Sequence, residues 1–270
     1  MKQLNSAKPT FSSTKLIKNQ KSKIVNCLLQ LIMIYLFTAC DKENAWDIVK
    51  TRGDRVVEQS VLPVFYAVKV GNGVNITLSQ GDDYAATIEG WKNLMPKIRL
   101  SVDKDGVLQI EDDNRFNFVR SRDNMTTIYL TVAGELNHIH FSGNGYFVSN
   151  DTICTPGLTV LCEEASGSME LKVKAQGIYI GTNHQNVASI TIGGRCNSVG
   201  ITNWGNAPVN LSALKASSAD VHHHGPGNLY VNASESISVV IYGMGDVYYL
   251  GNPLVTLTRK GKGNIYKMND

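Results

Sequence analysis

An 18-residue repeat near the carboxy terminus restricts the possible folds of this chain more than any other feature of its sequence. Residues 225–230 read Gly-Pro-Gly-Asn-Leu-Tyr, residues 243–248 read Gly-Met-Gly-Asp-Val-Tyr, and residues 261–266 read Gly-Lys-Gly-Asn-Ile-Tyr. A period of this length fits one coil of a β-solenoid, in which short strands meet at corners and successive coils pair about 4.8 Å apart. The repeat therefore predicts an all-β fold built as a parallel β-helix, or β-solenoid, with coils of about 18 residues.

The positions within the repeat separate an inner column of side chains from an outer one. Glycine lets the backbone of a corner take a positive φ without a Cβ clash. Side chains alternate between the two faces of a strand, so the apolar residues of the repeat are expected to stack inside, as a column of Leu229, Val247 and Ile265. The same alternation places an aromatic strip on an outer face, formed by Tyr230, Tyr248 and Tyr266.

The last coil carries the charges that an unpaired sheet edge requires. The inward column that holds Val231 and Tyr249 continues with Lys267. A charged edge resists pairing with a second chain, and further positive charges stand nearby at Arg259, Lys260 and Lys262.

The rest of the chain is expected to be less regular. Looser copies of the glycine corner stand at residues 142–147, 166–169 and 193–197, so the middle coils are expected to vary. Apolar residues alternate with polar ones between residues 65 and 79, which is typical of half-buried strands. Asp105-Gly106 separates two further alternating segments and predicts a hairpin in which both residues take a positive φ. The amino-terminal part of the solenoid is therefore predicted to contain a hairpin.

The amino terminus has the charge order of a secretory signal peptide. Residues 1–23 contain six lysines and no acidic residue, and residues 24–39 are mostly apolar. The apolar stretch includes Asn26 and Gln30 and is shorter than the about 20 residues that cross a membrane, so a permanent transmembrane helix is the less favoured alternative. We therefore predict a signal peptide at residues 1–39.

A cysteine follows this segment in a context that resembles a bacterial lipobox. In Leu36-Phe37-Thr38-Ala39-Cys40 a small residue precedes a thiol that would accept the lipid and become the new amino terminus. We expect Cys40 to anchor the chain to a membrane through acyl chains, followed by a polar tether over residues 40–60 and a single β-solenoid domain over residues 61–270. The alternative is that Cys40 is an ordinary apolar residue of the signal.

Removal of the leader reverses the net charge of the chain. The six basic residues of the first 40 positions account for the excess, so the formal charge changes from +3 to −3. The basic residues of the leader therefore do not indicate a nucleic-acid partner.

The corners and several other segments resemble a known family. The Gly-x-Gly-[Asn/Asp] corners, residues 231–237 and 246–253, and near the front residues 74–82 and 93–98, are similar to the auto-transporter adhesin "head GIN" domain of Bacteroidetes envelope lipoproteins. The likeness spans residues 64–267. It implies a right-handed parallel β-helix located in the cell envelope, anchored to the outer membrane and either periplasmic or surface-exposed.

Metal and cofactor chemistry finds little support in the sequence. On a strand, only His222 and His224 of the His222-His223-His224 run share a face, whereas zinc sites use three or four protein ligands. Asp103 opens what looks like a calcium loop, but no acidic residues follow at the later positions, and a hairpin accounts for it better. We therefore expect no metal site and no cofactor.

Acidic pairs and cysteines give no catalytic signature either. The pairs at residues 82–83, 112–113 and 163–164 are adjacent, so their carboxylates should diverge on a strand. Behind Cys40 stand Cys154, Cys162 and Cys196, an odd number that allows one disulfide at most. Cys154 with Cys162 is the nearest pair, although free thiols that pack as small hydrophobes are favoured.

Two classes of function remain from these observations. The favoured one is a non-enzymatic surface adhesin or ligand-binding scaffold that contacts glycans or envelope proteins along a flat face. The tyrosine strip is the candidate binding surface, although stacked rings that only stabilise the coils account for it more simply. The alternative is a polysaccharide-active lyase or hydrolase, because β-helices also host such enzymes and a fold does not fix a function.

Overall fold

The computed structural model describes residues 53–114 and 125–269. These residues belong to the second of two compact units of the chain, which spans residues 50–270. The predicted signal peptide and the predicted lipid attachment at Cys40 lie outside the described residues. Within the described ranges, no helix is long and apolar enough to cross a membrane.

Strands make up almost all of the regular structure in the described part of the chain. One turn of 3-10 helix, η1, spans Met95–Lys97. In chain order the strands are β1 (Arg55–Val61), β2 (Ala67–Val70), β3 (Val74–Gln80), β4 (Ala85–Trp91), β5 (Ile98–Val102), β6 (Val107–Asp112), β7 (Thr126–Val132), β8 (His138–Phe141), β9 (Tyr146–Cys154), β10 (Gly157–Cys162), β11 (Ser168–Lys174), β12 (Gly177–Thr182), β13 (Ser189–Asn203), β14 (Val209–His223), β15 (Leu229–Ile241), β16 (Val247–Leu250), β17 (Leu254–Arg259) and β18 (Ile265–Lys267).

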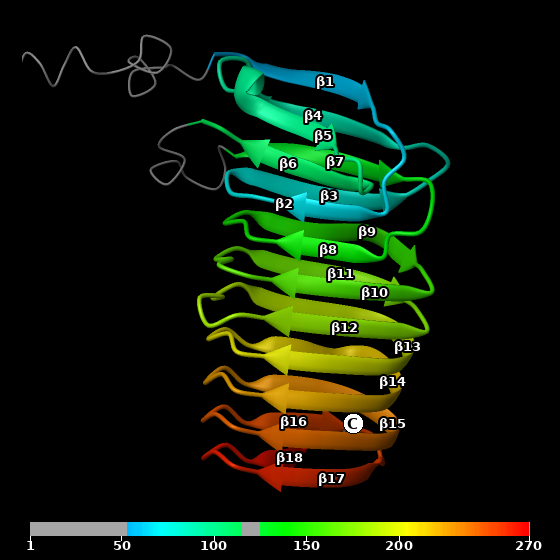
Figure 1. Cartoon of the computed structure of the whole chain (residues 1–270), viewed down its shortest axis with the longest axis vertical. Helices are drawn as coiled ribbons and strands as arrows, with labels where there is room; N and C mark the ends of the chain where they lie inside the picture. Colours follow the sequence, from blue (N-terminus) through cyan, green and yellow to red (C-terminus); the bar gives the residue numbers. More distant parts are fainter. Residues whose placement is uncertain (1–52, 115–124, 270) are drawn as a thin grey trace, which may run out of the picture. The chain divides into compact units, whose positions relative to one another are not determined.

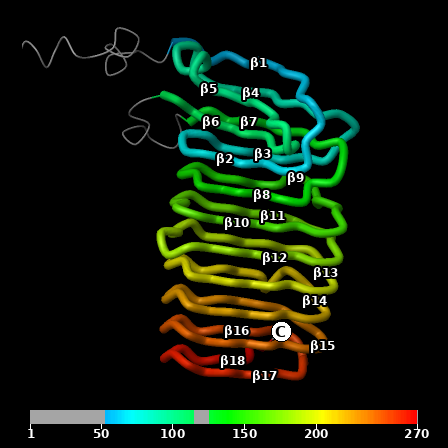
Figure 2. The backbone as a smooth tube through the Cα atoms, viewed as in Figure 1, coloured from blue at the N-terminus to red at the C-terminus, as the bar shows by residue number. Residues whose placement is uncertain are grey.

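The strands wind into two parallel sheets that face each other across a lumen (Figure 1). The first sheet contains β6, β2, β8, β10, β12, the second parts of β13, β14 and β15, and β17. The second sheet contains β7, β3, β9, β11, the first parts of β13, β14 and β15, and then β16 and β18. Figure 2 shows the chain lying coil on coil. The predicted parallel β-solenoid is confirmed.

The lumen is filled by apolar columns that run along the stack of coils. In the first sheet, inward side chains stand directly opposite one another in a column that includes Val160, Ile180, Ile201, Val221 and Val239. In the second sheet the predicted inner column is confirmed, because Leu229 pairs with Val247 and Val247 with Ile265. Full burial of one such side chain contributes about 1.5–3 kcal/mol, so these columns hold the coils together.

The last coils have the length of the sequence repeat, whereas the coils before them are longer. Leu229 pairs with Val247 at the spacing of the repeat. In earlier coils Val209 pairs with Leu229, and Phe147 pairs with Met169. The two residues of each of these pairs lie further apart in the sequence than Leu229 and Val247 do. The additional residues lie in the corners and in bulges, such as the shift of register between Asn210 and Lys215. The inward columns keep their register because the extra residues lie outside the paired segments.

Antiparallel strands interrupt the coil pattern in the amino-terminal part. Strand β4 pairs with β7, and β1 pairs with β4. Strand β1 also extends the sheet into residues of the stretch 40–60 that the sequence assigns to the tether. Strands β5 and β6 form the predicted hairpin, with Leu100 opposite Ile110.

The turn of this hairpin differs from the expected one at a single position. Gly106 has a φ of +66°, as expected, but Asp105 does not have a positive φ. Among the described non-glycine residues, Glu164 is the one with a positive φ. The Asp103 carboxylate organises the turn instead, since it accepts hydrogen bonds from the backbone N–H of Asp105 at 2.9 Å and of Val107 at 3.0 Å. The hydrogen bond from the backbone N–H of Val107 is the main reason why the pKa of Asp103 is lowered.

The glycines of the repeat are required by close contact between coils. A Cβ on Gly167 would lie 1.7 Å from the carbonyl oxygen of Gly145, and a Cβ on Gly225 would lie 2.0 Å from that of Gly205. The sequence predicted that these glycines are needed for a positive φ, and this is wrong, because none of the glycines of the repeat has one. The described glycines with a positive φ are Gly53, Gly73, Gly106, Gly194 and Gly251. We call this line of turns, in which the first sheet passes into the second, the glycine corner.

The segment Gly193-Gly194-Arg195-Cys196-Asn197 is not part of the glycine corner, which corrects the prediction from its glycines; the chain passes here from the second sheet into the first. It lies within β13, where Gly193 pairs with Lys172 and Gly194 with Val173. Gly194 has a φ of +116°, and a Cβ there would lie 2.0 Å from the carbonyl oxygen of Val173. The glycine corner of this coil instead contains Trp204 and Gly205, directly under Gly225.

The carboxy-terminal coil leaves apolar side chains uncovered. Leu254 is 76% exposed and Leu257 is 43% exposed on β17, the last strand of the first sheet. The expected charges surround this edge: Lys267 Nζ donates to the side chain of Asn252 at 2.5 Å, and Arg259 Nη1 donates to Asn264 at 2.7 Å. Lys267 also continues the column of Val231 and Tyr249, as predicted.

Substitution of Gly167 by valine should lower the free energy of unfolding by at least about 3 kcal/mol, because the new side chain has no room above the Gly145 carbonyl. Urea unfolding followed by circular dichroism measures the change. Gly157→Ala is the matched control, since a Cβ there would meet its nearest neighbour, the Gly177 carbonyl, at 3.8 Å. Equal stability of the two variants would contradict the contact argument.

Candidate functional site

The predicted tyrosine strip lies on the outer face of the second sheet. Strands β15, β16 and β18 place Tyr230, Tyr248 and Tyr266 directly opposite one another. The ring centroids of Tyr230 and Tyr248 are 5.0 Å apart with 17° between the planes, and those of Tyr248 and Tyr266 are 5.4 Å apart with 29° between the planes. The position of the strip agrees with the alternation in the sequence, and its role in ligand binding stays a prediction.

The stacking limits what this strip presents to a ligand. Rings that are this close and nearly parallel overlap, so neighbouring rings partly cover both faces of Tyr248. Burial, followed by the charge of Asp246 and the neighbouring phenols, raises the pKa of Tyr248, which therefore keeps its proton at neutral pH. The strip offers ring edges and hydroxyl groups rather than one continuous flat face.

A second aromatic column follows the glycine corner. Trp204 and His224 stack with centroids 3.5 Å apart, His224 and Tyr242 stack at 4.2 Å, and His184 meets Trp204 edge-on at 4.5 Å. Lys260 continues the column, with its ammonium 4.9 Å from the centre of the Tyr242 ring. Sequence reasoning missed this column, although its last four members share one signal: each directly precedes the first glycine of its corner.

The three consecutive histidines divide between the surface and the lumen. His222 and His224 point outward and are partly exposed, whereas His223 is fully buried. The outer two pack against Tyr242, at centroid distances of 6.5 Å for His222 and 4.2 Å for His224. The expected alternation is therefore confirmed, and the outward histidines take part in an aromatic column.

A short polar column crosses the apolar lumen beneath the glycine corner. Thr182 Oγ1 donates to Asn203 Oδ1 at 2.7 Å, and Asn203 Nδ2 lies 3.3 Å from His223 Nδ1. Thr182 Oγ1 also accepts from the backbone N–H groups of Trp204 at 3.0 Å and Gly205 at 2.9 Å. Burial lowers the pKa of His223, and the backbone of Gly227 and the charge of Asp246 oppose this only in part. The ring of His223 is therefore neutral in the folded protein near pH 7.

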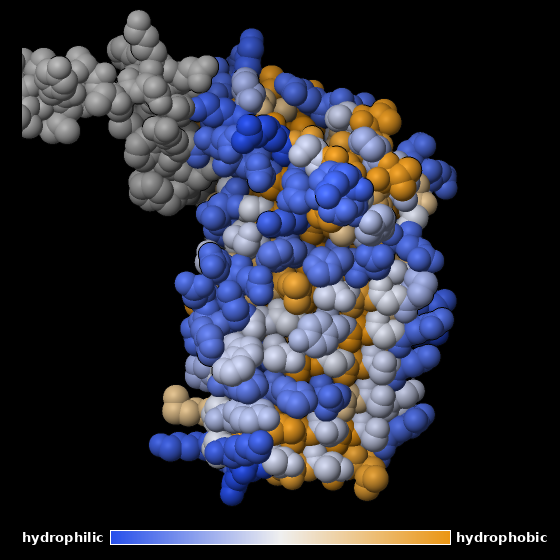
Figure 3. Space-filling model, in the orientation of Figure 1, coloured by the Kyte–Doolittle hydropathy of each residue, from blue (hydrophilic) through white to orange (hydrophobic). Residues whose placement is uncertain are grey.

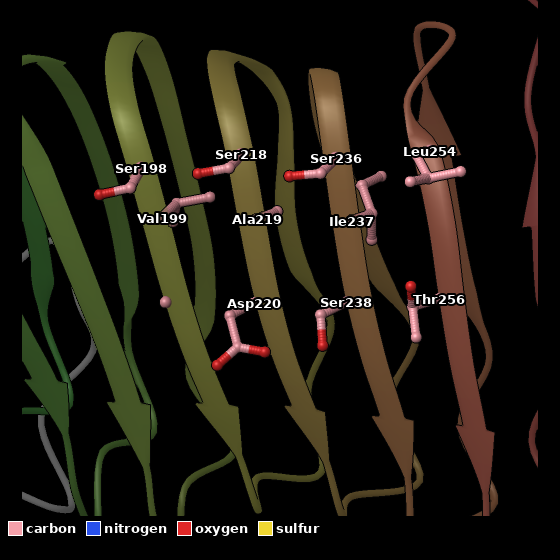
Figure 4. Close-up of a pocket in the computed structure, with 11 residues that line it drawn as sticks. Ser198, Val199, Ser218, Ala219, Asp220, Ser236, Ile237, Ser238, Leu254 and Thr256 are labelled. Carbon is pink, nitrogen blue, oxygen red and sulfur yellow. The ribbon is translucent and has the colours of Figure 1, made fainter.

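The outer face of the first sheet carries a shallow trough lined by small and hydroxylated side chains. Ser198, Ser218 and Ser236 stand opposite one another on β13, β14 and β15, and a parallel row holds Asp220, Ser238 and Thr256 (Figure 4). They line a hollow of about 420 Å³. Figure 3 shows this part of the face as white residues of intermediate hydropathy with orange, hydrophobic residues between them, bordered by hydrophilic residues.

Two further hollows continue the trough toward the amino-terminal coils. One of about 500 Å³ lies over β8, β10 and β12 and includes His138, Thr159 and Ser198 in its lining. The other, of about 340 Å³, lies nearer the glycine corner and includes Glu163, Asn183 and Trp204. All three hollows lie on the outer surface of the first sheet, away from the tyrosine strip.

Titratable groups of the described residues do not gather as a metal centre would require. No group of three or more His, Cys, Asp or Glu side chains in these residues is placed to hold a metal ion. The adjacent carboxylates of Asp112 and Asp113 take different partners, since Asp112 accepts from Asn114 and Asp113 pairs with Arg99. Glu163 pairs with His140 at 3.1 Å.

The cysteines of the described chain are free thiols. Cys154 is exposed, whereas Cys162 and Cys196 are buried, so the alternative disulfide between Cys154 and Cys162 is not formed. Burial raises the pKa of Cys162 to about 12 and that of Cys196 to about 11. Both buried thiols stay protonated and pack as small apolar side chains.

Together these features define a parallel β-solenoid with a hydroxylated trough on one sheet and an aromatic strip on the other. A family model described as "Putative auto-transporter adhesin, head GIN domain" matches residues 64–253, and the chain belongs to this family. The predicted family resemblance is thereby confirmed. Among curated protein sequences, none is significantly similar to the chain.

Solved structures from Bacteroidetes share the fold. A "putative adhesin" from Bacteroides fragilis is 21% identical, with a TM-score of 0.70 over 80% of this chain and 97% of the other. A "putative adhesin" from Parabacteroides merdae is 17% identical, with a TM-score of 0.60 over 82% and 99% of the two chains. A "putative lipid binding protein" from Parabacteroides distasonis is 17% identical, with a TM-score of 0.61 over 80% and 98%. At these identities the likeness concerns the fold.

Replacement of Tyr248 by alanine should lower the free energy of unfolding by about 1–2 kcal/mol, because it removes both ring contacts of the strip. Chemical unfolding measures the loss. Tyr129→Ala is the control, since Tyr129 is 43% exposed on β7, and aromatic ring stacking is not among its contacts in the described residues. Tyr248→Ala with the stability of the parent chain would contradict a structural role for the strip.

The stability of the domain should fall as the pH decreases below about 6.5, the ordinary pKa of histidine. Because folding lowers the pKa of His223, the unfolded chain takes up a proton at this ring first as the pH decreases. Between the pKa of the unfolded chain and the lower pKa of the folded chain, each pH unit lowers the free energy of unfolding by at most about 1.4 kcal/mol. Above about pH 6.5 the ring of His223 is neutral in both the folded and the unfolded chain, and its full contribution to stability is present.

A comparison of unfolding free energies at several pH values measures this slope. His223→Leu should flatten it, because leucine cannot be protonated in the lumen. His184→Leu is the matched control, because it removes an exposed histidine instead of the buried one. An unchanged slope in His223→Leu would show that other groups cause the pH dependence.

Proposed function

We propose that this chain is a cell-envelope lipoprotein whose solenoid acts as a non-enzymatic surface adhesin or ligand-binding scaffold. The observation that carries the proposal is the hydroxylated trough, a run of open hollows along one flat sheet. Membership of an adhesin-type family supports it and favours an envelope or surface location. Glycans or envelope proteins are the partners that such a long face suits, because hydroxyl groups alternate with apolar side chains along it.

The trough favours binding over catalysis. Hydroxyl groups of serine and threonine give and accept hydrogen bonds without changing the ligand. The carboxylates in the lining, Glu163 and Asp220, belong to different hollows, so they do not form the pair that glycoside hydrolysis needs. The polysaccharide-active alternative therefore lacks a supporting arrangement in the described residues.

The open form of the hollows also argues against a lipid ligand for this chain, because a lipid chain lying in them would stay largely exposed to solvent. A lipid chain gains most of its binding energy from apolar burial, about 0.8 kcal/mol for each buried methylene. The lumen that could supply such burial is filled by the chain's own side chains. We therefore assign lipid to the anchor at Cys40 and not to the solenoid.

The anchor is tested by substitution of its cysteine. Cys40→Ala should move the chain from the membrane fraction to the soluble fraction of broken cells, because the thiol that accepts the acyl chains is gone. Metabolic labelling with a fatty acid should mark the parent chain and not the variant. Retention of Cys40→Ala in the membrane fraction would contradict lipid anchoring.

The adhesin role is tested on intact cells. Added protease should remove the solenoid from cells that display it, and these cells should then lose adherence to glycan-coated surfaces. Incubation of the full chain with the same glycans should release no new reducing ends or unsaturated products. Product release would favour the enzyme, and adherence that survives protease removal would contradict the adhesin role.

A further inference from the structure

One aromatic side chain stands in the trough outside both stacked columns. Tyr179 points outward from β12 and is 42% exposed. Its direct neighbours on the adjacent strands are Thr159 and Gly200. Neither neighbour carries a ring that could form a ladder with it, which sets Tyr179 apart from Tyr230, Tyr248 and Tyr266.

Gly200 keeps one side of the Tyr179 ring open. A Cβ on Gly200 would lie 3.4 Å from Cδ2 of the ring, so a side chain there would contact the ring and cover it. Gly181 is buried, and a Cβ there would lie 2.8 Å from Cδ2 of Leu161 and 3.3 Å from Cε1 of the ring. Neither glycine has positive φ, so the backbone of these positions does not itself demand glycine.

Tyr179 also joins two hollows of the trough. It lines the 340 Å³ hollow next to Glu163, Asn183 and Thr202. It equally lines the 500 Å³ hollow next to His138 and Thr159. Volumes of this size are typical of small-ligand sites, so an extended ligand can occupy both hollows and pass over the ring.

The charge of the lining selects against anions. The three hollows contain Glu163 and Asp220 but no Lys or Arg among their lining residues in the described chain. An acidic polysaccharide would place its carboxylates next to these groups without a compensating cation. Uncharged hydroxyl groups, in contrast, find serine, threonine and asparagine partners along the trough.

We propose that Tyr179 and the two hollows beside it bind a neutral oligosaccharide. The C–H groups of a sugar ring pack against the exposed phenol, whose face is electron-rich, while the sugar hydroxyls bond to Asn183, Thr159 and Thr202. This inference rests on the proposed binding function and names its ligand class and its site.

Affinity electrophoresis of the full chain in detergent tests the site, with gels that contain xylan, mannan, β-glucan or amylopectin, and in parallel polygalacturonate or alginate. At least one neutral polysaccharide should retard the parent chain, and the acidic ones should not. Tyr179→Ala should weaken this binding by about tenfold or more, as loss of a central aromatic contact does. Tyr179→Phe keeps the ring and should retain most of the affinity.

The Gly200→Val variant tests whether binding requires an uncovered Tyr179 ring or only the presence of the tyrosine. It leaves Tyr179 in place but covers it from the neighbouring strand, where a β-branched residue suits the sheet, so binding should weaken as in Tyr179→Ala. Tyr129→Ala, at a site of almost equal exposure on β7, should bind as the parent chain does. Circular dichroism of each variant reports whether it is folded.

Each other outcome overturns the inference. Retardation by acidic polysaccharides alone, or by none of the neutral ones, contradicts the ligand class. Parent-like binding by folded Tyr179→Ala contradicts the site, and a loss confined to Tyr248→Ala places the site on the tyrosine strip. In these last two cases the adhesin function stands, whereas a chain that mediates adherence to no surface at all fails the proposed function itself.

Discussion

The parallel backbone hydrogen bonds between successive coils determine the rest of this structure. They place each residue directly over its counterpart one coil away, both along the strands and at the glycine corner, where the N–H of Gly245 donates to the Gly225 carbonyl at 3.1 Å. A position in one coil therefore becomes part of a column. Apolar columns fill the lumen, and aromatic columns form wherever neighbouring coils carry rings at the same position.

This register gives the corner and the sheet faces different tolerances. At the corner the backbones approach so closely that glycine is required by contact, as the Gly167 and Gly145 pair shows. On the sheet faces a side chain has room, and glycine there instead changes the surface, as at Gly200 beside Tyr179. The same residue type thus maintains the stack in one place and shapes a binding surface in another.

The sequence alone was sufficient for the architecture and for one of the two aromatic columns. The copies at residues 225, 243 and 261 lie in coils of equal length, so their pairing could be read directly from the spacing. Earlier coils vary in length, and the glycines at 193 and 194 resemble a corner although they lie within β13. Local composition does not distinguish a bulge from a corner, because both bring backbone close to backbone.

The part of the trough around Tyr179 could not have been predicted for a related reason. Thr159, Tyr179 and Gly200 share a cross-strand position but no residue type, and they are not evenly spaced along the sequence. A column of unlike residues leaves no periodic signal. Only the register between coils shows that Thr159 and Gly200 are the direct neighbours of a single exposed ring.

The two sheets turn their outer faces in opposite directions, with about 10 Å between the sheet planes in typical sheet packing. The tyrosine strip and the trough therefore cannot contact the same small molecule. A partner held on one face leaves the other accessible, so a single domain has the geometry to bridge two surfaces and to gain avidity from simultaneous engagement.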